Sequence, residues 1–345
     1  MSRKTIAIVG SGIAGYAAAL GLAELLRGEH EIIVLDKSAD FVFTPSLTWY
    51  PFDLRKKDDI SFDVRPVYDK HGISFNQTLV TGFDLDGRQV LTTEEPVRYD
   101  FLLIATGPHV DFDNIPGLGP HRHSLSICSL EHAEEAKHAW ELFLKDPGPI
   151  VIGAAQGSAC YGAACEFLFN VRYQLEKQNL HHEAPITYVT AEEVLEHFGF
   201  GDLGTGRSKA ERMFRMCGIE TRANARIREV TENGVSLESG EFLPSKFTMI
   251  IPRFVGVEAV RATPGLANGE GFIRVDERAR HPEYPNVYAA GAAVRVPPPG
   301  ETHVACGLPE AGFPSERMGE TAARNIAAEI QSGERKTMPR PIYPV

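Results

Sequence analysis

The stretch TIAIVGSGIAG, residues 5–15, decides the fold of this chain. Residues 5–9 form a short apolar run, three glycines follow with GxGxxG spacing, and an Ala/Leu-rich segment over residues 16–26 predicts a helix. A second apolar run at residues 32–35 ends on Asp36, 21 residues after the last glycine. This order predicts a βαβ unit with parallel strands.

The glycines of this motif have separate physical roles in binding a dinucleotide. Gly10 permits a tight turn, Gly12 lets the backbone approach a pyrophosphate, and Gly15 lets helix and strand pack closely. The helix N-terminus offers free N–H groups and a positive dipole end to phosphates, and Asp36 can accept hydrogen bonds from ribose hydroxyls. The residues expected to contact the dinucleotide here are Gly10, Gly12, Ala14, Gly15, Asp36 and Lys37.

Two later segments favour FAD over NAD by resemblance. Residues 103–107, LIATG, resemble a strand of flavoproteins with two dinucleotide-binding domains, and residues 286–291, NVYAAG, resemble their flavin-contacting C-terminal strand. Most of that group has Asp where this chain has Ala292, so the contact of that Asp with the ribityl chain is absent or made otherwise. The resemblance implies FAD as cofactor, with further contacts from Pro45, Ser46, Ala105, Thr106, Gly107, Gly291 and Gly312.

The chain repeats the strand–glycine–helix pattern once more. Residues 149–153 begin the second passage, residues 187–190 supply its partner strand, and a buried strand at residues 287–291 returns to the first unit. The predicted fold class is α/β, with two Rossmann-like dinucleotide-binding domains, the second inserted in the first. The FAD-binding domain is predicted over 1–112 and 256–345, and the NAD(P)-domain-like one, carrying the redox cysteine, over 113–255.

The second glycine passage is a poor nicotinamide site. Residues 153–157, GAAQG, lack the GxGxxG spacing, and Cys160 follows them at the predicted helix entry. A helix N-terminus favours the thiolate form of a cysteine. An inert buried thiol is the ordinary interpretation of one cysteine. We nevertheless expect Cys160 to be redox-active, because it occupies the place where NAD(P)H would otherwise bind.

Over nearly its whole length the chain resembles the sulfide:quinone oxidoreductases and, more distantly, the flavocytochrome c sulfide dehydrogenases. The resemblance is specific at residues 126–133 (SICSLEHA), 149–167 and 249–252 (MIIP). It implies a flavoenzyme that oxidises sulfide or a related sulfur species through a cysteine persulfide and passes electrons to a quinone or another acceptor. Cys160 would belong to the sulfur-handling pair, and Cys128 would be a third functional thiol, bonded covalently to FAD in some members.

The resemblance also implies groups that assist the sulfur chemistry. His132 and His197 would lie near the sulfur site, where a side chain that titrates near neutrality can carry protons. An ordinary helix-surface role for His132 stays open. Glu166 matches a carboxylate near the flavin. The last helix, predicted over about 315–330, would aim its N-terminus at the flavin, with Pro and Ser315 in capping positions.

The resemblance breaks near the end of the sequence. The family's partner for Cys160 would lie beyond Val345, and the family's quinone pocket and membrane-binding helices would follow there as well. A truncated chain and a shortened relative with another acceptor both explain this. In the second case Cys306 or Cys165 could be the partner thiol. Five helical residues turn the side chains of Cys160 and Cys165 apart. The resemblance implies that Cys306 lies close to the flavin, so Cys306 is preferred. Cys217 is expected to be structural.

Composition excludes some functions and leaves others open. A net charge of −11 argues against nucleic acid as a partner. No apolar run reaches the roughly 18 residues of a transmembrane helix, and the N-terminus is interpreted as a buried strand, not a signal peptide. The five cysteines fit no metal-site spacing, so no metal is predicted. Three points stay open. The protein could be cytoplasmic, it could contact a membrane peripherally through a region absent here, and it could form a homo-oligomer.

Two alternative functions also stay open. A single-subunit NADH dehydrogenase uses the same fold, although the degraded second glycine passage argues against it. A non-catalytic FAD-binding redox sensor is the other alternative, and it would hold flavin without turning over any quinone.

Overall fold

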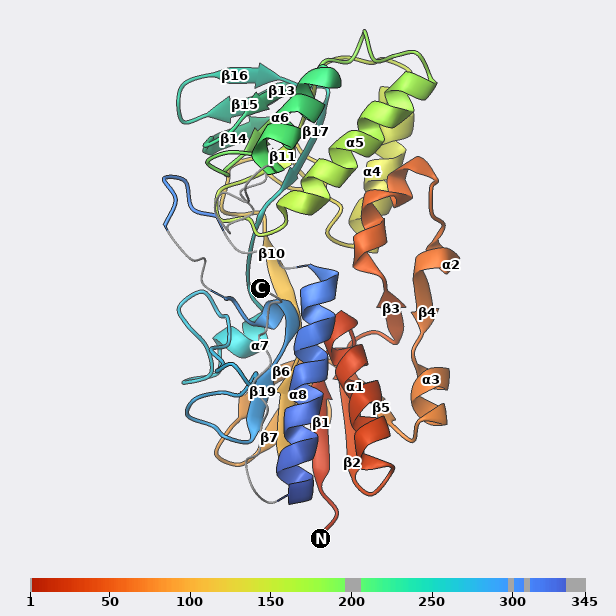
Figure 1. Cartoon of the computed structure of the whole chain (residues 1–345), viewed down its shortest axis with the longest axis vertical. Helices are drawn as coiled ribbons and strands as arrows, with labels where there is room; N and C mark the ends of the chain where they lie inside the picture. Colours follow the sequence, from red (N-terminus) through yellow and green to blue (C-terminus); the bar gives the residue numbers. More distant parts are fainter. Residues whose placement is uncertain (1, 196–205, 297–300, 307–310, 333–345) are drawn as a thin grey trace.

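The computed structural model describes residues 2–195, 206–296, 301–306 and 311–332. This part of the chain forms two α/β bodies, one above the other in Figure 1, and each is built on its own parallel sheet. The chain starts in the lower body, forms the upper one, and returns to the lower one for its last strand and helix. The predicted fold class is therefore confirmed.

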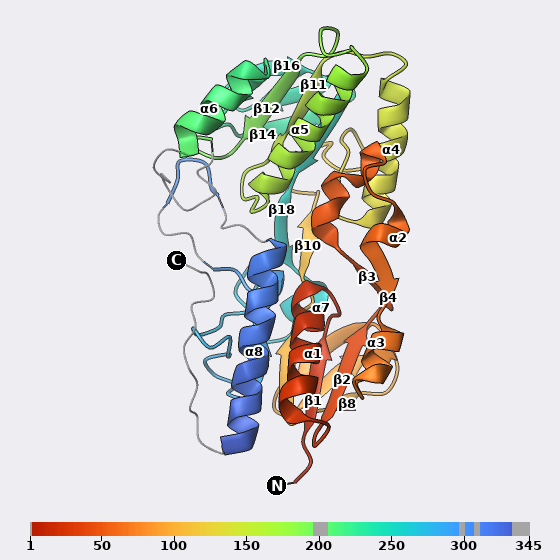
Figure 2. The same cartoon turned by 45° about the vertical axis from the view of Figure 1, so that its right-hand side comes forward.

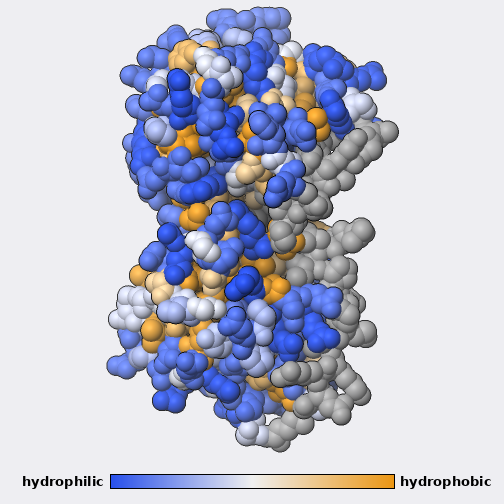
Figure 3. Space-filling view, turned by 90° about the vertical axis from the view of Figure 1, so that its left-hand side faces the viewer, coloured by the Kyte–Doolittle hydropathy of each residue, from blue (hydrophilic) through white to orange (hydrophobic). Residues whose placement is uncertain are grey.

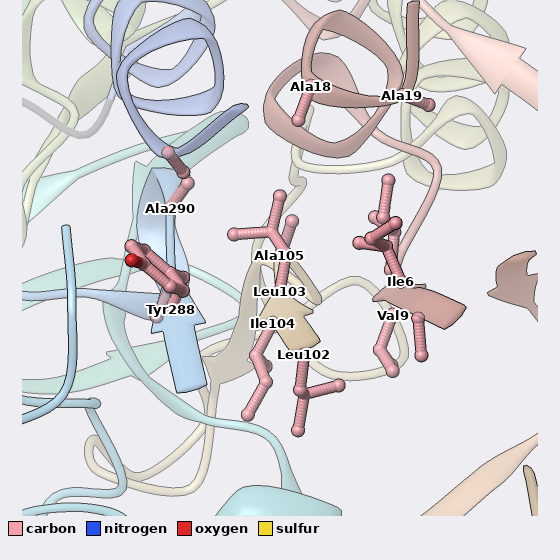
Figure 4. Close-up of a cluster of buried hydrophobic side chains, with 14 of the residues drawn as sticks. Ile6, Val9, Ala18, Ala19, Leu102, Leu103, Ile104, Ala105, Tyr288 and Ala290 are labelled. Carbon is pink, nitrogen blue, oxygen red and sulfur yellow. The ribbon is translucent and has the colours of Figure 1, made fainter. Parts of the chain in front are cut away.

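The sheet of the lower body contains the predicted βαβ unit, and its strands are parallel. In spatial order they are β19 (Val287–Ala289), β9 (Phe101–Ile104), β1 (Thr5–Val9), β2 (Glu31–Asp36) and β5 (Ser74–Gln77). Its central strands are apolar on both faces, as in parallel sheets that are covered on both sides. Figure 4 shows Leu103 and Ala105 pointing toward α1 (Ile13–Leu26), with Leu102 and Ile104 on the opposite face.

Helices α1 and α8 (Gly312–Ser332) lie side by side over this sheet. Both begin about three residues earlier than predicted. Gly12 is the N-cap of α1, so the helix starts at Ile13 and not at residue 16. The predicted capping role of Ser315 is wrong, because its N–H already donates to the Ala311 carbonyl (3.2 Å) within the first turn of α8. A proline at residue 314 is compatible with that first turn.

The upper body has a second parallel sheet. Its strands, in spatial order, are β13 (Glu220–Arg222), β12 (Ile186–Thr190), β11 (Ile150–Ala154) and β17 (Phe247–Ile251). Helices α4 (Leu130–Phe143), α5 (Tyr161–Lys177) and α6 (Gly206–Met216) lie around it (Figure 1). The pairing of β11 with β12 confirms the predicted second strand–helix–strand passage.

Two antiparallel strands connect the bodies. Strands β10 (Pro108–Asp111) and β18 (Arg253–Gly256) pair between them (Figure 1), and the Arg253 guanidinium lies 2.7 Å from the Asp111 carboxylate. The predicted domain boundaries fall at the ends of these strands, and they stay a prediction. Figure 3 shows a mostly hydrophilic face, on which apolar residues gather at the narrowing between two lobes.

A segment that the sequence did not predict joins the bodies on the side turned forward in Figure 2. It comprises β3 (Asp40–Val42), η1 (Thr44–Thr48), η2 (Tyr50–Phe52), α2 (Lys57–Ile60), β4 (Ser61–Asp63) and α3 (Arg65–Lys70). Phe52 packs between Trp140 and Phe167 of the upper body, at centroid distances of 5.3 and 5.2 Å. The lower body is thereby anchored to α4 and α5.

Smaller elements complete the described structure. They are β6 (Val80–Asp84), β7 (Gln89–Thr92), β8 (Val97–Arg98), β14 (Ile227–Thr231), β15 (Gly234–Leu237), β16 (Phe242–Pro244), α7 (Glu258–Arg261) and η3 (Gly291–Ala293). Among the described residues, no helix combines the length and apolarity needed to span a bilayer.

Candidate active site

The glycine turn after β1 is dense on one side and open on the other. Gly10 has φ +101°, and a Cβ there would lie 2.3 Å from the Ala105 carbonyl oxygen. A Cβ on Gly15 would lie 1.9 Å from the Gly10 oxygen. At Gly12, by contrast, no described atom comes within 4 Å of the Cβ position. The turn therefore leaves room in front of Gly12, where a pyrophosphate would approach.

The groups around this space fit a dinucleotide. Gly12 caps α1 without a side chain, and the first turn carries no acidic residue, so the positive helix end faces the open side. The Asp36 carboxylate is fixed beside the turn, because it accepts the N–H groups of Ser11 (2.6 Å) and Ser38 (3.0 Å). A carboxylate has about four lone-pair positions, so Asp36 can still accept ribose hydroxyls.

Other predicted cofactor residues converge on the same end of α1. A Cβ on Gly291 (φ +67°) would lie 2.9 Å from the Ala14 Cβ, and one on Gly312 would lie 3.0 Å from the Pro45 Cγ. Gly107, with φ +66°, has no described atom within 4 Å of its Cβ position. The N-termini of α1 and α8 therefore lie against the residues that follow β9 and β19, and against η1. Ser46 lies in η1, Thr106 follows β9, and Lys37 is exposed after β2.

Cys160 lies at the carboxyl edge of the upper sheet. It is the N-cap of α5, and its N–H donates to the Ser158 hydroxyl (3.3 Å). A Cβ on Gly153 would lie 1.9 Å from the Val189 oxygen, so this glycine holds β11 against β12 and fixes where the loop before Cys160 starts. The first turn of α5 has no acidic side chain, and this helix end favours a thiolate.

Cys306 lies beside the entry of α5, although 146 residues separate it from Cys160 in the sequence. The Gly157 N–H donates to the Ala305 carbonyl (2.7 Å), which holds the two loops together. Cys306 is 8% exposed, and burial raises the pKa of its thiol, with Glu192 and Glu193 adding to the rise and hydrogen bonds with Tyr161 and Thr302 opposing it. Burial therefore favours the protonated form of Cys306 when this cysteine is reduced.

The other cysteines pack against the same hydrophobic core of the upper body. These are Cys128, Cys165 and Cys217, in addition to Cys160 and Cys306. Burial raises the pKa of the Cys128 thiol, although a hydrogen bond with Ser126 partly opposes this. Cys128 is thus protonated at neutral pH. The Cys165 thiol donates to the Tyr188 hydroxyl (3.3 Å), inside the body and away from the solvent side of α5.

The remaining predicted groups are placed differently. Glu166 is exposed on α5, where it accepts a hydrogen bond from the Trp49 indole (2.5 Å) of the joining segment. His132 lies in the first turn of α4 with its ring against Phe112 (5.6 Å), and burial lowers its pKa. The contacts described for His132 involve α4 and the end of β10, not Cys160. His197 lies outside the described residues.

Sequence reasoning missed several groups at this site. The side chains of Trp49 and Tyr50 hydrogen-bond to Glu166 of α5 and Glu134 of α4, and so hold the joining segment against the upper body. These contacts join residues that are far apart in the sequence, so only the tertiary structure shows them. The hydrogen bond to Glu134 raises the pKa of Tyr50 to about 12. Glu192 lies two residues beyond the end of β12, whereas Asp36 is the last residue of β2, so the ribose-acid pattern does not extend to Glu192.

A hollow of about 750 Å³ opens elsewhere on the upper body. Its lining includes Pro149 and Lys246, which precede β11 and β17, so it lies at the amino edge of the sheet. Ligands of open parallel sheets bind at the carboxyl edge, where Cys160 lies. The hollow and Cys160 therefore lie at opposite edges of the same sheet.

Comparison with known proteins agrees with this geometry. A family model described as pyridine nucleotide-disulphide oxidoreductase matches residues 4–307. Sulfide-quinone reductase of Aquifex aeolicus is 32% identical over 344 residues, which cover 98% of this chain and 79% of that protein. The X-ray structure of the Aquifex aeolicus sulfide:quinone oxidoreductase superposes with a TM-score of 0.91 at 32% identity, over 95% of this chain and 77% of that one.

A relative from another organism carries a different name. An NADH dehydrogenase-like protein of Mycobacterium tuberculosis is 27% identical over 343 residues, covering 94% of this chain and 80% of that protein. Its similarity is lower than that of the sulfide-quinone reductase over a comparable length. The chain therefore belongs to the pyridine nucleotide-disulphide oxidoreductases and, among them, to the sulfide:quinone oxidoreductase family, as a flavoenzyme whose cofactor is FAD.

Proposed function

We propose that this enzyme oxidises sulfide, or a closely related sulfur species, and passes the electrons through FAD to a quinone. The observation that carries the proposal is the position of Cys160 at the N-terminus of α5, beside Cys306, where a dinucleotide-binding unit would otherwise bind nicotinamide. The similarity to sulfide-quinone reductase supports the choice of substrate and acceptor.

The chain supplies the sulfur-exchange half of the reaction. In our proposal Cys160 and Cys306 form a disulfide, and a hydrosulfide ion attacks one of its sulfurs. One S–S bond forms as the other breaks, which gives a persulfide on one cysteine and a thiolate on the other. The positive end of α5 stabilises a thiolate at Cys160. FAD, when bound, supplies the two-electron acceptor.

NADH oxidation is the competing function, and the NADH dehydrogenase-like relative favours it. The second glycine loop opposes it, because the Gly157 N–H that would face a pyrophosphate already donates to Ala305. A Cβ on Gly157 would also lie 3.4 Å from the Arg253 Cβ, so the loop is covered by protein. We therefore expect NADH to bind and react poorly here.

An anaerobic titration of the purified holoenzyme separates the two functions. We expect one equivalent of sulfide to bleach the visible absorption of the flavin. NADH should bleach it at least about a hundredfold more slowly, because Ala305 and Arg253 cover the second glycine loop, where NADH would bind. Rapid bleaching by NADH, with no response to sulfide, would overturn the proposed function.

The quinone is proposed to dock on apolar side chains at the N-terminus of α8. Phe43 (46% exposed) and Phe313 (61% exposed) flank the contact between Pro45 and Gly312, at the outer edge of the cofactor site. Large exposed apolar groups beside a buried site are typical of a ligand surface. The electron acceptor would thus approach on the α8 side and sulfide on the α5 side.

Replacing both Phe43 and Phe313 by serine is expected to raise the KM for a quinone at least about tenfold, since each buried aromatic contributes roughly 1.5 kcal/mol or more. The anaerobic reduction of the flavin by sulfide should not change. Leu79→Ser is the matched control, because Leu79 is similarly exposed (52%) and lies between β5 and β6. An unchanged KM in the double variant would place the quinone elsewhere.

A further inference from the structure

A short part of the joining segment packs between two helices of the upper body. We call residues 44–53, which include η1 and η2, the spacer. The Thr48 carbonyl of the spacer accepts a hydrogen bond from the Asn170 side chain of α5 (3.1 Å). The Tyr50 hydroxyl donates to the Glu134 carboxylate of α4. Thr48 and Tyr50 are both buried, so the spacer is held to the two helices largely away from water.

The contacts on α5 lie close to Cys160. Cys160 is the N-cap of this helix, and Phe167 and Asn170 follow it by seven and ten residues, or about two and three turns. Phe52 of the spacer packs against Phe167 at a centroid distance of 5.2 Å, and Phe167 has no exposed surface. Because a helix moves as one unit over three turns, a shift of α5 at Asn170 also displaces Cys160.

The other end of the spacer touches the proposed cofactor site. A Cβ on Gly312, the first residue of α8, would lie 3.0 Å from the Pro45 Cγ and 3.2 Å from the Ile13 Cδ1. Ile13 is the first residue of α1, which follows the glycine turn. Pro45 therefore packs where the entries of both helices meet, beside the turn that is proposed to bind FAD.

Local hydrogen bonds and two prolines make the spacer stiff. The Thr48 hydroxyl donates to the Pro45 carbonyl (3.2 Å) in the first part of the spacer. The Phe52 N–H donates to the Trp49 carbonyl (3.2 Å) in the second part. Pro45 and Pro51 each have a fixed φ, which removes backbone freedom from both parts. A displacement of one end is thereby passed to the other.

The antiparallel pair of β10 and β18 also connects the bodies, but it gives limited support by itself. A two-stranded pair is only marginally stable alone. The cysteines pack against the core of the upper body, whereas the glycine turn follows β1 of the lower one (Figure 1). The separation of the sulfur site from the cofactor site therefore depends on further contacts between the bodies, and the spacer supplies buried ones.

We propose that the spacer sets the distance between Cys160 and the cofactor site, and that Asn170 is the positioning residue through which the spacer acts on α5. Sulfide attack on the pair of Cys160 and Cys306 takes place within the upper body. The two electrons then pass to FAD in the lower body, so only this second step crosses the junction. The catalytic consequence rests on the proposed function, but the mechanical role of Asn170 does not.

The test separates the two steps in one reaction. Asn170→Ala removes the donor to the Thr48 carbonyl, and we expect persulfide formation to stay within about twofold of the wild type. Flavin reduction should slow about tenfold, because a misplacement of about 1 Å between reacting groups costs up to about a hundredfold. The FAD-loaded protein is mixed rapidly with sulfide without oxygen. Persulfide is read by mass spectrometry of quenched samples, and the flavin by absorbance.

Asn325→Ala is the matched control. The Asn325 side chain also donates to a backbone carbonyl, that of Arg278 (2.7 Å), but this bond lies within the lower body. Asn325 is buried, so its loss should lower the melting temperature while both steps stay within about twofold of the wild type. If flavin reduction slows equally in the two variants, or if Asn170→Ala slows both steps equally, Asn170 is not a positioning residue.

Tyr50→Phe covers the case in which Asn170→Ala does not fold. It keeps the ring and removes only the hydroxyl that donates to Glu134 on the α4 side. We expect the same selective effect, with flavin reduction at least about threefold slower and persulfide formation unchanged. Flavin reduction at the wild-type rate would contradict the role of the spacer.

A measurement without sulfide distinguishes failure of this proposal from failure of the proposed function. Amide hydrogen exchange over residues 44–53 of the FAD-loaded protein should be at least about tenfold faster in Asn170→Ala than in Asn325→Ala, because the spacer loses a buried hydrogen bond. Equal exchange in the two variants would overturn the mechanical role of Asn170. If sulfide forms no persulfide and reduces no flavin in the wild type, the proposed function fails, and the exchange result still decides the role of Asn170.

Discussion

The Cys160→Ala variant is expected to retain FAD and to lose sulfide-dependent flavin reduction by about a thousandfold or more. In the proposed mechanism Cys160 forms the covalent intermediate, and neighbouring residues cannot replace it in that role. Cys160 lies at the N-cap of α5, whereas the glycine turn proposed to bind FAD lies in the other body, so cofactor content should not change. Stopped-flow absorbance under anaerobic conditions measures the rate.

Cys217→Ala is the matched control for this change. Cys217 is also half-buried and packs against the same core, but it follows α6 and not the loop before α5. Its loss should leave the rate within about twofold of the wild type, as expected for a structural thiol. If Cys160→Ala reduces its flavin as fast as Cys217→Ala, the sulfur chemistry does not pass through Cys160.

A second large effect is expected at the glycine turn. Gly12→Asp should leave the protein folded but weaken FAD binding at least about a hundredfold. The chain itself tolerates the side chain, because nothing described lies within 4 Å of the Cβ position and the φ of −73° is ordinary. The new carboxylate would occupy the space of the pyrophosphate and oppose its charge at the helix N-terminus.

FAD content after gel filtration, together with a thermal unfolding curve, measures this effect. Gly269→Asp is the control, since Gly269 is exposed, also has no described atom within 4 Å of its Cβ position, and lies in a loop after α7. It should keep its full complement of FAD. Equal FAD content in the two variants would contradict the assignment of the cofactor to the turn at residues 10–15.

The local part of the fold could be predicted from sequence because its determinants are local. Strand β1 has the predicted bounds, and the roles of Gly10 and Gly15 follow from contacts made within or next to one βαβ unit. The start of α1 was predicted late because a glycine N-cap leaves no polar side-chain signal. The joining segment was missed because Phe52 gains its stability from Trp140 and Phe167, residues that are far away in the sequence.

The candidate site likewise has one part that local sequence predicts and one part that depends on distant contacts. The helix-entry position of Cys160 could be predicted from the strand and glycines before it. The proximity of Cys306 depends on the hydrogen bond between Gly157 and Ala305, which no spacing rule predicts, and here only the resemblance to a family gave an indication.

The most direct test is a crystal structure of the FAD-bound protein. We expect the isoalloxazine ring in van der Waals contact with the Cys160 sulfur, at about 4 Å, with the Cys306 sulfur on the same side of the ring. A sulfur remote from the ring, or an open nicotinamide cleft between the ring and α5, would contradict the account.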